Sequence, residues 1–167
     1  VKVISSENMI PSEDYDICIS LQDIIFALKM GSGNIPYTDG YLEIGDNENI
    51  ITKSSKFKIG FAYQGNKNAN YEQRDLSLDF FVNLSNRIDA EFFSLQYGSS
   101  EKNEKICFIG SKFVNFMDTA KAIKSMDLVI STDNVVLNLA GALGVKTLGL
   151  FSKNPNSRWF KLSGDNV

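Results

Sequence analysis

Residues 127–144 read DLVISTDNVVLNLAGALG, and this stretch decides the fold class. The apolar run at 128–131 has the length and the β-branched residues of a short buried strand, and a polar turn links it to a helical pattern. Asp133 stands just before that pattern, where we expect it to be the N-cap of the helix. The helix is apolar on nearly every side, which predicts that it is buried against a sheet.

The chain from residue 57 onward repeats this arrangement. Strands are expected at 57–63, 90–96, 106–109, 128–131 and 147–151, with helical patterns between them. One of these patterns covers Leu78, Phe81, Val82 and Leu84, and another follows Asp118, which we expect to be its N-cap. Such alternation predicts an α/β fold, a Rossmann-like doubly wound parallel sheet with right-handed crossovers and strand order 3-2-1-4-5.

The first 56 residues have a different character. Strands are expected at 1–4 and 17–21 and a short helix at 22–30, and residues 31–55 form a polar connection rich in Gly, Asn and Ser. We therefore interpret 1–56 as the tail of a preceding domain plus a linker, and 57–167 as a Rossmann-like domain. Because the sequence starts with Val1, it is expected to be a fragment or a processed chain.

Composition excludes several classes of function. The net charge is −3 and the 17 Lys and Arg residues are scattered, so a nucleic-acid partner is not expected. No apolar stretch approaches the roughly 20 residues of a membrane span and no signal peptide is apparent, so we expect a soluble, cytoplasmic protein. The sequence has no histidine, which excludes a histidine base and a histidine-bearing zinc site.

The two cysteines, Cys18 and Cys107, are flanked by β-branched or aromatic residues. That pattern predicts two buried thiols within strands, and we expect that they do not form a disulfide with each other.

Candidate ligand-binding residues lie in two loops. In a sheet of the predicted order, ligands bind outside the carboxyl ends of the first and fourth strands. The first loop, 64–74, carries Gly65, Asn66, Lys67 and Arg74, and the second, 131–135, leads from Asp133 into a helix N-terminus. Backbone amides there favour a phosphate, and Lys67 or Arg74 could complete a diphosphate clamp.

Simpler interpretations of the same residues stay open. The first loop could be an ordinary solvated connection, and Arg74 could pair with a nearby carboxylate. Asp133 could serve only as a helix cap. The glycine motifs of dinucleotide-binding and P-loop proteins are absent, so neither of those classes is predicted.

Several motifs together resemble a known family. They are residues 117–120 (MDTA), 127–133 (DLVISTD), 138–144 (NLAGALG) and 157–159 (SRW), together with 60–66 (GFAYQGN) and 94–96 (SLQ). In this order and spacing they resemble the C-terminal, donor-binding domain of heptosyltransferase-like, family 9 glycosyltransferases, especially those attached to tetratricopeptide arrays. The resemblance implies the second half of a two-domain GT-B architecture. It also implies a nucleoside diphosphate sugar as substrate, no metal cofactor, and a missing first domain or tetratricopeptide region as partner.

The resemblance also implies roles for individual residues. The Asp133 loop and the following helix, with Asn134, Val135 and Asn138, would lie beside the diphosphate and the sugar, and Arg74 would approach a phosphate. Gln96 and Tyr97 would lie near the nucleoside, and Asp118 and Thr119 near the ribose or the base.

The chain departs from the family pattern at the expected phosphate loop. Where the family has Asp-Thr-(Gly or Ser)-x-x-His, this chain has Asn134, Val135 and Asn138 after Asp133. A valine could crowd the phosphate, and Asn138 can hydrogen-bond but cannot carry a charge.

These departures leave two hypotheses and a weaker third. The first is the donor-binding half of a transferase of hexosyl or heptosyl groups, catalytically inactive without the first domain that carries its base. The second is a degenerate, non-catalytic remnant or interaction module. A two-domain nucleotide-sugar epimerase is the less favoured third class.

Overall fold

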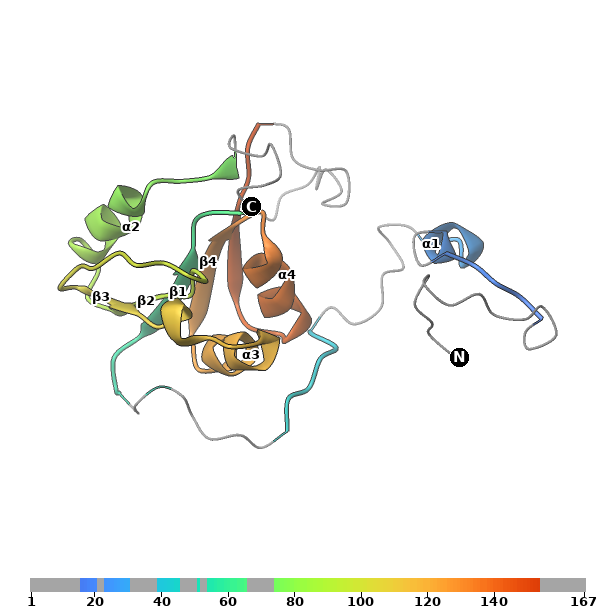
Figure 1. The fold of residues 1–167 in the computed structure, drawn as a ribbon, viewed down its shortest axis with the longest axis horizontal. Coiled ribbons are helices and arrows are strands. Elements are labelled where there is room, and N and C mark those ends of the chain that lie inside the picture. Colours follow the sequence, from blue (N-terminus) through green and yellow to red (C-terminus); the bar gives the residue numbers. More distant parts are fainter. Residues whose placement is uncertain are drawn as a thin grey trace. The chain divides into compact units, whose positions relative to one another are not determined.

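The computed structural model describes residues 16–20, 23–30, 39–45, 51, 54–65 and 74–153. The chain divides into two compact units, Val1–Pro36 and Tyr37–Val167 (Figure 1). In the first unit the described residues contain one short helix, α1 (Ile24–Ala27), whose preceding turn joins the Ser20 hydroxyl to Asp23 Oδ2 at 2.7 Å. The strand expected at 17–21 is not formed by the described residues 16–20, and the strand expected at 1–4 lies outside the described residues.

The second unit is built on a five-stranded sheet in which every pair of neighbours is parallel. Its strands are β1 (Lys58–Ala62), β2 (Glu91–Ser94), β3 (Ile106–Phe108), β4 (Leu128–Thr132) and β5 (Thr147–Leu150). The order is β3-β2-β1-β4-β5, which confirms the predicted fold class and places β1 beside β4. Gly60 of β1 is aligned with Phe93 of β2 on one side and Val129 of β4 on the other.

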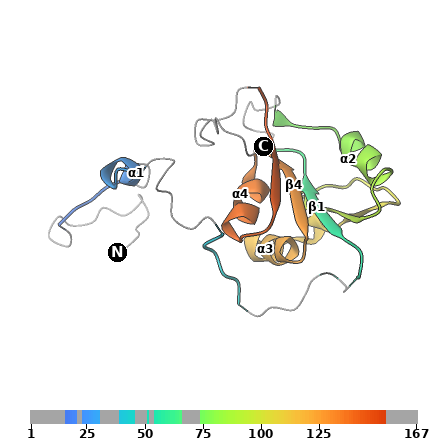
Figure 2. The same cartoon turned by 180° about the vertical axis from the view of Figure 1, so that it is seen from behind.

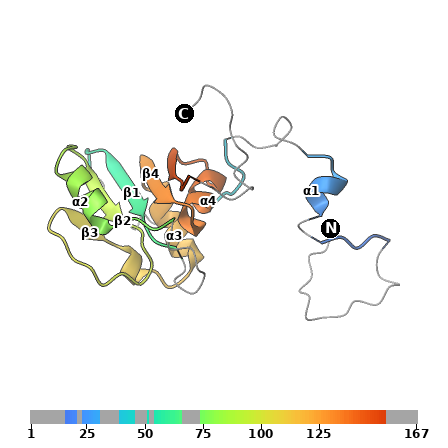
Figure 3. The same ribbon diagram turned by 90° about the horizontal axis from the view of Figure 1, so that it is seen from above.

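Helices cover both faces of this sheet (Figures 2 and 3). On one face, α3 (Phe116–Lys124) and α4 (Val135–Ala142) bury Ala120, Ile123 and Ala140 in a cluster with Phe93 and Val129. On the other face, α2 (Leu78–Ser85) packs against the sheet through Phe81. A short 3-10 helix, η3 (Gly110–Lys112), follows β3.

The α2 face is held by stacked aromatic rings. The rings of Phe61 and Phe81 are 4.2 Å apart at 10°, and both side chains are fully buried. Tyr63 and Phe92 pack against Phe61 in the same cluster. Apolar residues alternate between the two faces of β1 and β2 because successive side chains of a strand point to opposite sides.

Part of the expected linker belongs to the second unit. The N–H groups of Tyr41 and Leu42 both donate to the carbonyl of Ala142 at 2.8 Å, at the end of α4. Ile44 packs against the α3/α4 core, and Ile51 is buried in it. The segment 39–45 is called the strap below, and the second unit starts at Tyr37 rather than at residue 57.

Both predicted helix caps are wrong by one to three residues. Asn115, not Asp118, is the N-cap of α3, and Asp118 is the third residue of the helix and accepts the Asn115 N–H in a capping box. Asn134, not Asp133, is the N-cap of α4. Asn and Asp cap about equally well, so the composition of each turn leaves the choice between neighbours open.

The two cysteines are more exposed than the sequence predicts. Cys18 lies outside any strand and Cys107 lies in β3, but both are exposed rather than buried. Both are free thiols, as expected.

Candidate functional site

The carboxyl ends of β1 and β4 lie side by side, and the two predicted loops leave the sheet there. The β1 loop begins with Tyr63, Gln64 and Gly65, and the β4 loop contains Asp133 and Asn134 and leads into α4. Asn66 and Lys67, which were predicted to bind phosphate, lie outside the described residues.

Arg74 and Asp133 form an ion pair across the space between these loops. Arg74 Nη1 donates to Asp133 Oδ2 at 2.8 Å and contacts the Asp133 carbonyl oxygen at 3.4 Å. The Asp133 side chain is 1% exposed and that of Arg74 is 20% exposed. A buried carboxylate needs such a partner because removing a charge from water is costly. The structure therefore brings together two predicted site residues that lie far apart in the sequence.

Asn134 organises the first turn of α4. Its Oδ1 accepts the N–H groups of Val136 at 2.9 Å and Leu137 at 3.4 Å, and also the Ser131 hydroxyl at 3.0 Å. These two amides belong to the helix N-terminus at which a phosphate was expected.

The two other departures from the family pattern lie on the exposed side of α4. Val135 is 53% exposed. Asn138 is also exposed, and its Nδ2 donates to the Asn134 carbonyl at 3.0 Å. Both side chains are therefore accessible at the start of this helix.

Gln96 holds the backbone of the β1 loop. Its Oε1 accepts the N–H groups of Tyr63 at 3.2 Å and Gln64 at 3.0 Å, and its Nε2 donates to the Gln64 carbonyl at 3.3 Å. Gly65 is fixed by a further contact, from its N–H to Asp75 Oδ1 at 2.9 Å. The Gln96 side chain is thus hydrogen-bonded to the backbone of the β1 loop, and the hydrogen bond between Gly65 and Asp75 holds the same loop.

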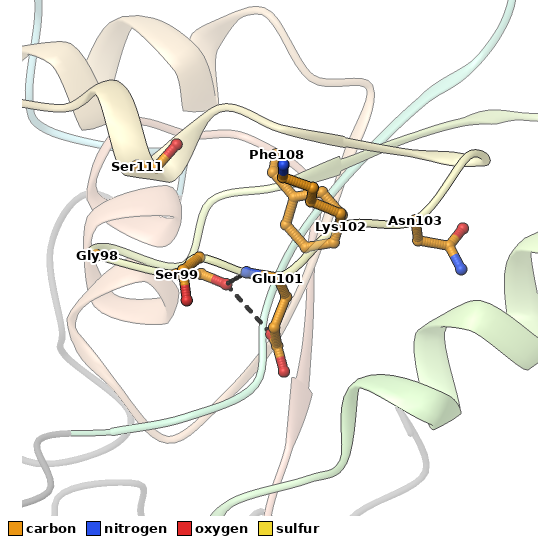
Figure 4. A pocket seen from close by; sticks show the side chains of 8 residues that line it. Gly98, Ser99, Glu101, Lys102, Asn103, Phe108 and Ser111 are labelled. Carbon is orange, nitrogen blue, oxygen red and sulfur yellow. Dashed lines mark hydrogen bonds between the residues drawn. The ribbon is translucent and has the colours of Figure 1, made fainter.

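An open pocket of about 650 Å³ lies beyond the carboxyl ends of β2 and β3 (Figure 4). It is lined by Gly98, Ser99, Ser100, Glu101, Lys102, Asn103, Phe108 and Ser111. Glu101 is fastened there, because its carboxylate accepts the Ser99 hydroxyl at 3.1 Å and also the Tyr63 hydroxyl. Tyr63 therefore connects this pocket with the β1 loop.

The residues predicted to lie near the nucleoside do not line this pocket. Tyr97 is 72% exposed beside it in the sequence, and Gln96 holds the β1 loop. Asp118 Oδ2 accepts the N–H groups of Val114 and Asn115, and Thr119 is buried in α3.

Glu101 lines this pocket but is not among the site residues predicted from the sequence. An acidic residue after the second strand of a Rossmann-like sheet is a signal that could have found it, because carboxylates at this place accept ribose hydroxyls. Its seven-residue separation from the end of β2 weakened that signal.

The described part of the chain holds neither a metal-binding cluster of side chains nor a helix that could cross a membrane. Within those residues no group of three or more His, Cys, Asp or Glu side chains is placed to hold a metal ion. No helix among them has the length and apolar character that crossing a membrane requires.

Comparison with known proteins gives no match: no family model, no curated protein and no solved structure is found to be similar to this chain. The fold and the side chains at the carboxyl edge of the sheet are therefore the basis for proposing a function.

Proposed function

We propose that the second unit binds a nucleoside diphosphate sugar and is the donor-binding half of a glycosyltransferase. The observation that carries the proposal is the meeting of Arg74 and the start of α4 beside the adjacent ends of β1 and β4. In doubly wound sheets this is the place where phosphorylated ligands bind. A guanidinium and a helix N-terminus both favour phosphate oxygens.

Each part of such a ligand has a place along this edge. The diphosphate is assigned to the space between Arg74 and the first turn of α4, with the sugar toward Asn138. The nucleoside is assigned to the pocket at 98–111, where Phe108 offers an aromatic surface and the Glu101 carboxylate can accept ribose hydroxyls. The Tyr63 hydroxyl contacts Glu101 in the pocket, and the carbonyl of the next residue, Gln64, contacts Asn134 at the start of α4. This short connection supports a single ligand spanning both positions.

The proposal extends to the whole enzyme. A GT-B partner domain or a tetratricopeptide region completes the enzyme, with the first domain supplying the general base and binding the acceptor. A hexosyl or heptosyl group is transferred in the cytoplasm without a metal cofactor. Glycosyl transfer requires donor, acceptor and base in one geometry, so this chain alone is expected to be inactive.

A thermal-shift and calorimetric screen with ADP, UDP, GDP and dTDP, and with their sugar conjugates, tests this proposal. A ligand present at about 100 times its Kd should stabilise the folded state by about 2.7 kcal/mol. Binding that weakens as salt is added is expected, since phosphate recognition is electrostatic. Absence of any heat at millimolar nucleotide with folded protein would refute donor binding.

A second function, a degenerate module that keeps the fold without binding a donor, is favoured by one observation. The groups expected to hold phosphate already have internal partners: Asn134 accepts two N–H groups of α4, and Asp133 faces Arg74. On this alternative the wild-type chain binds no nucleotide.

A restored variant separates the two functions. Asn134→Thr, Val135→Gly and Asn138→His together recreate the family pattern after Asp133. If the wild-type chain binds a nucleotide, donor binding has survived the departures. If only the restored variant binds, the site has degenerated, and if neither binds, the assignment of this loop to phosphate is wrong.

A further inference from the structure

The carbonyl oxygen of Gln64 is shared by two other loops of the site. Gln96 Nε2, from the segment after β2, donates to it at 3.3 Å, and Asn134 Nδ2, from the segment after β4, contacts it at 3.5 Å. One backbone atom after β1 thus joins the three loops at the carboxyl edge of the sheet.

Gln96 makes three of the hydrogen bonds that join these loops. Besides the Gln64 carbonyl, it binds the N–H groups of Tyr63 and Gln64 through its Oε1. A single amide side chain therefore satisfies three backbone groups on two consecutive residues, immediately after β1 ends. The length and the paired donor and acceptor of glutamine suit this task, whereas a hydrocarbon side chain of the same length offers neither.

The segment that Gln96 binds contacts both the pocket and the start of α4. The Tyr63 side chain reaches Glu101 in the pocket at 98–111, and the Gln64 backbone meets Asn134 at the start of α4. Movement of residues 63–65 would therefore change the separation between the proposed nucleoside and phosphate positions.

We propose that Gln96 is a positioning residue for nucleotide binding, which fixes the β1 loop so that the pocket and the phosphate position fit one ligand. This inference rests on the proposed function and reassigns Gln96 from a nucleoside contact to a residue that acts through the backbone. Preorganisation of this kind raises affinity because the loop need not be ordered when the ligand binds.

The test compares wild type with Gln96→Met and Gln96→Glu, using amide hydrogen exchange and calorimetric titration with ADP, UDP and GDP. Gln96→Met should speed exchange at Tyr63 and Gln64 and weaken the best-bound diphosphate by about tenfold or more, with the protein still folded at the assay temperature. Gln96→Glu keeps the acceptor oxygen, so exchange at these two amides should stay slow. If Gln96→Met acted only by lowering the overall stability of the domain, there would be no reason for Gln96→Glu to restore slow exchange at these two amides.

Asn86→Ala is the matched control. Asn86 is an exposed amide after α2 whose side chain accepts a hydrogen bond from Lys105 Nζ at 2.7 Å, and its backbone N–H donates within α2. It should change neither exchange in the β1 loop nor affinity for the three diphosphates.

Each result decides the inference. If wild type binds a diphosphate and Gln96→Met binds it equally well, or if Gln96→Met leaves exchange at Tyr63 and Gln64 unchanged, Gln96 is not a positioning residue. If wild type binds none of ADP, UDP, GDP and dTDP and none of their sugar conjugates, the proposed function fails first and the ligand-positioning role fails with it.

Discussion

At the scale of single residues, the neighbours Asp133 and Asn134 have different roles in the turn before α4. Either could cap α4, but Asn134 does so while Asp133 turns into the interior and pairs with Arg74. An amide can accept helix N–H groups and donate to the Gln64 carbonyl as well, which an ionised carboxylate cannot do. The carboxylate is better placed opposite a cation, where its charge is compensated.

The ion pair between Arg74 and Asp133 is expected to stabilise the folded domain. Arg74→Ala should lower the free energy of unfolding by about 3 kcal/mol, because it removes the cation beside a buried carboxylate. Denaturant unfolding measures this change. Combining it with Asp133→Asn should cost less than the sum of the two single changes, and strict additivity would show that the two side chains are not coupled.

At the scale of elements, the strap and the end of α4 need two glycines in contact. Gly40 and Gly144 have φ values of +98° and +70°, and a Cβ on Gly144 would lie 2.2 Å from the Asp39 carbonyl oxygen. Both positions therefore require glycine for conformation and for space. The close approach lets Tyr41 and Leu42 donate to Ala142.

Gly144→Ala should destabilise the domain by about 2 kcal/mol or more, because a left-handed backbone and a backbone overlap act together. Thermal or denaturant unfolding is the measurement. Gly141→Ala is the matched control in α4: nothing lies within 4 Å of its added Cβ, and helix propensity should make it stabilising by up to about 1 kcal/mol. Equal effects of the two changes would contradict the contact between strap and helix.

At the scale of the whole molecule, the strap and Ile51, which precede β1, are part of the second unit. The strap supplies hydrogen bonds to the end of α4, and Ile51 completes the core beneath α3 and α4. A domain that started at residue 57 would leave that apolar surface uncovered. The polar composition of 31–55 concealed this role, although Ile44 and Ile51, among its described residues, pack in or against the core.

A truncation series tests the boundary. A chain of residues 37–167 should unfold at a denaturant midpoint close to that of residues 1–167, whereas 57–167 should be less stable by at least about 2 kcal/mol from the lost burial of Ile51 alone. Equal stability of the two truncated chains would show that the strap and Ile51 contribute nothing to folding.

The sequence by itself determined the sheet. All five strands could be predicted, with ends within two residues of those observed, because short apolar runs separated by amphipathic helices have few other ways to bury themselves. The strand order follows from the same pattern, and with it the edge at which ligand-binding residues were sought. The structure places these residues at that edge: Asp133 and Asn134 follow β4 directly, and Arg74 pairs with Asp133 there.

Tertiary structure alone decided what those residues touch. Arg74 pairs with Asp133, 59 residues further along the chain, and Gln96 binds the Gln64 backbone, 32 residues before it. No local sequence pattern encodes either contact. The exposure of Cys107 and the burial of Ile51 likewise depend on which segments cover them. Periodicity reports how one segment is buried, whereas hydrogen bonds and ion pairs between loops depend on the three-dimensional placement of side chains after the sheet has formed.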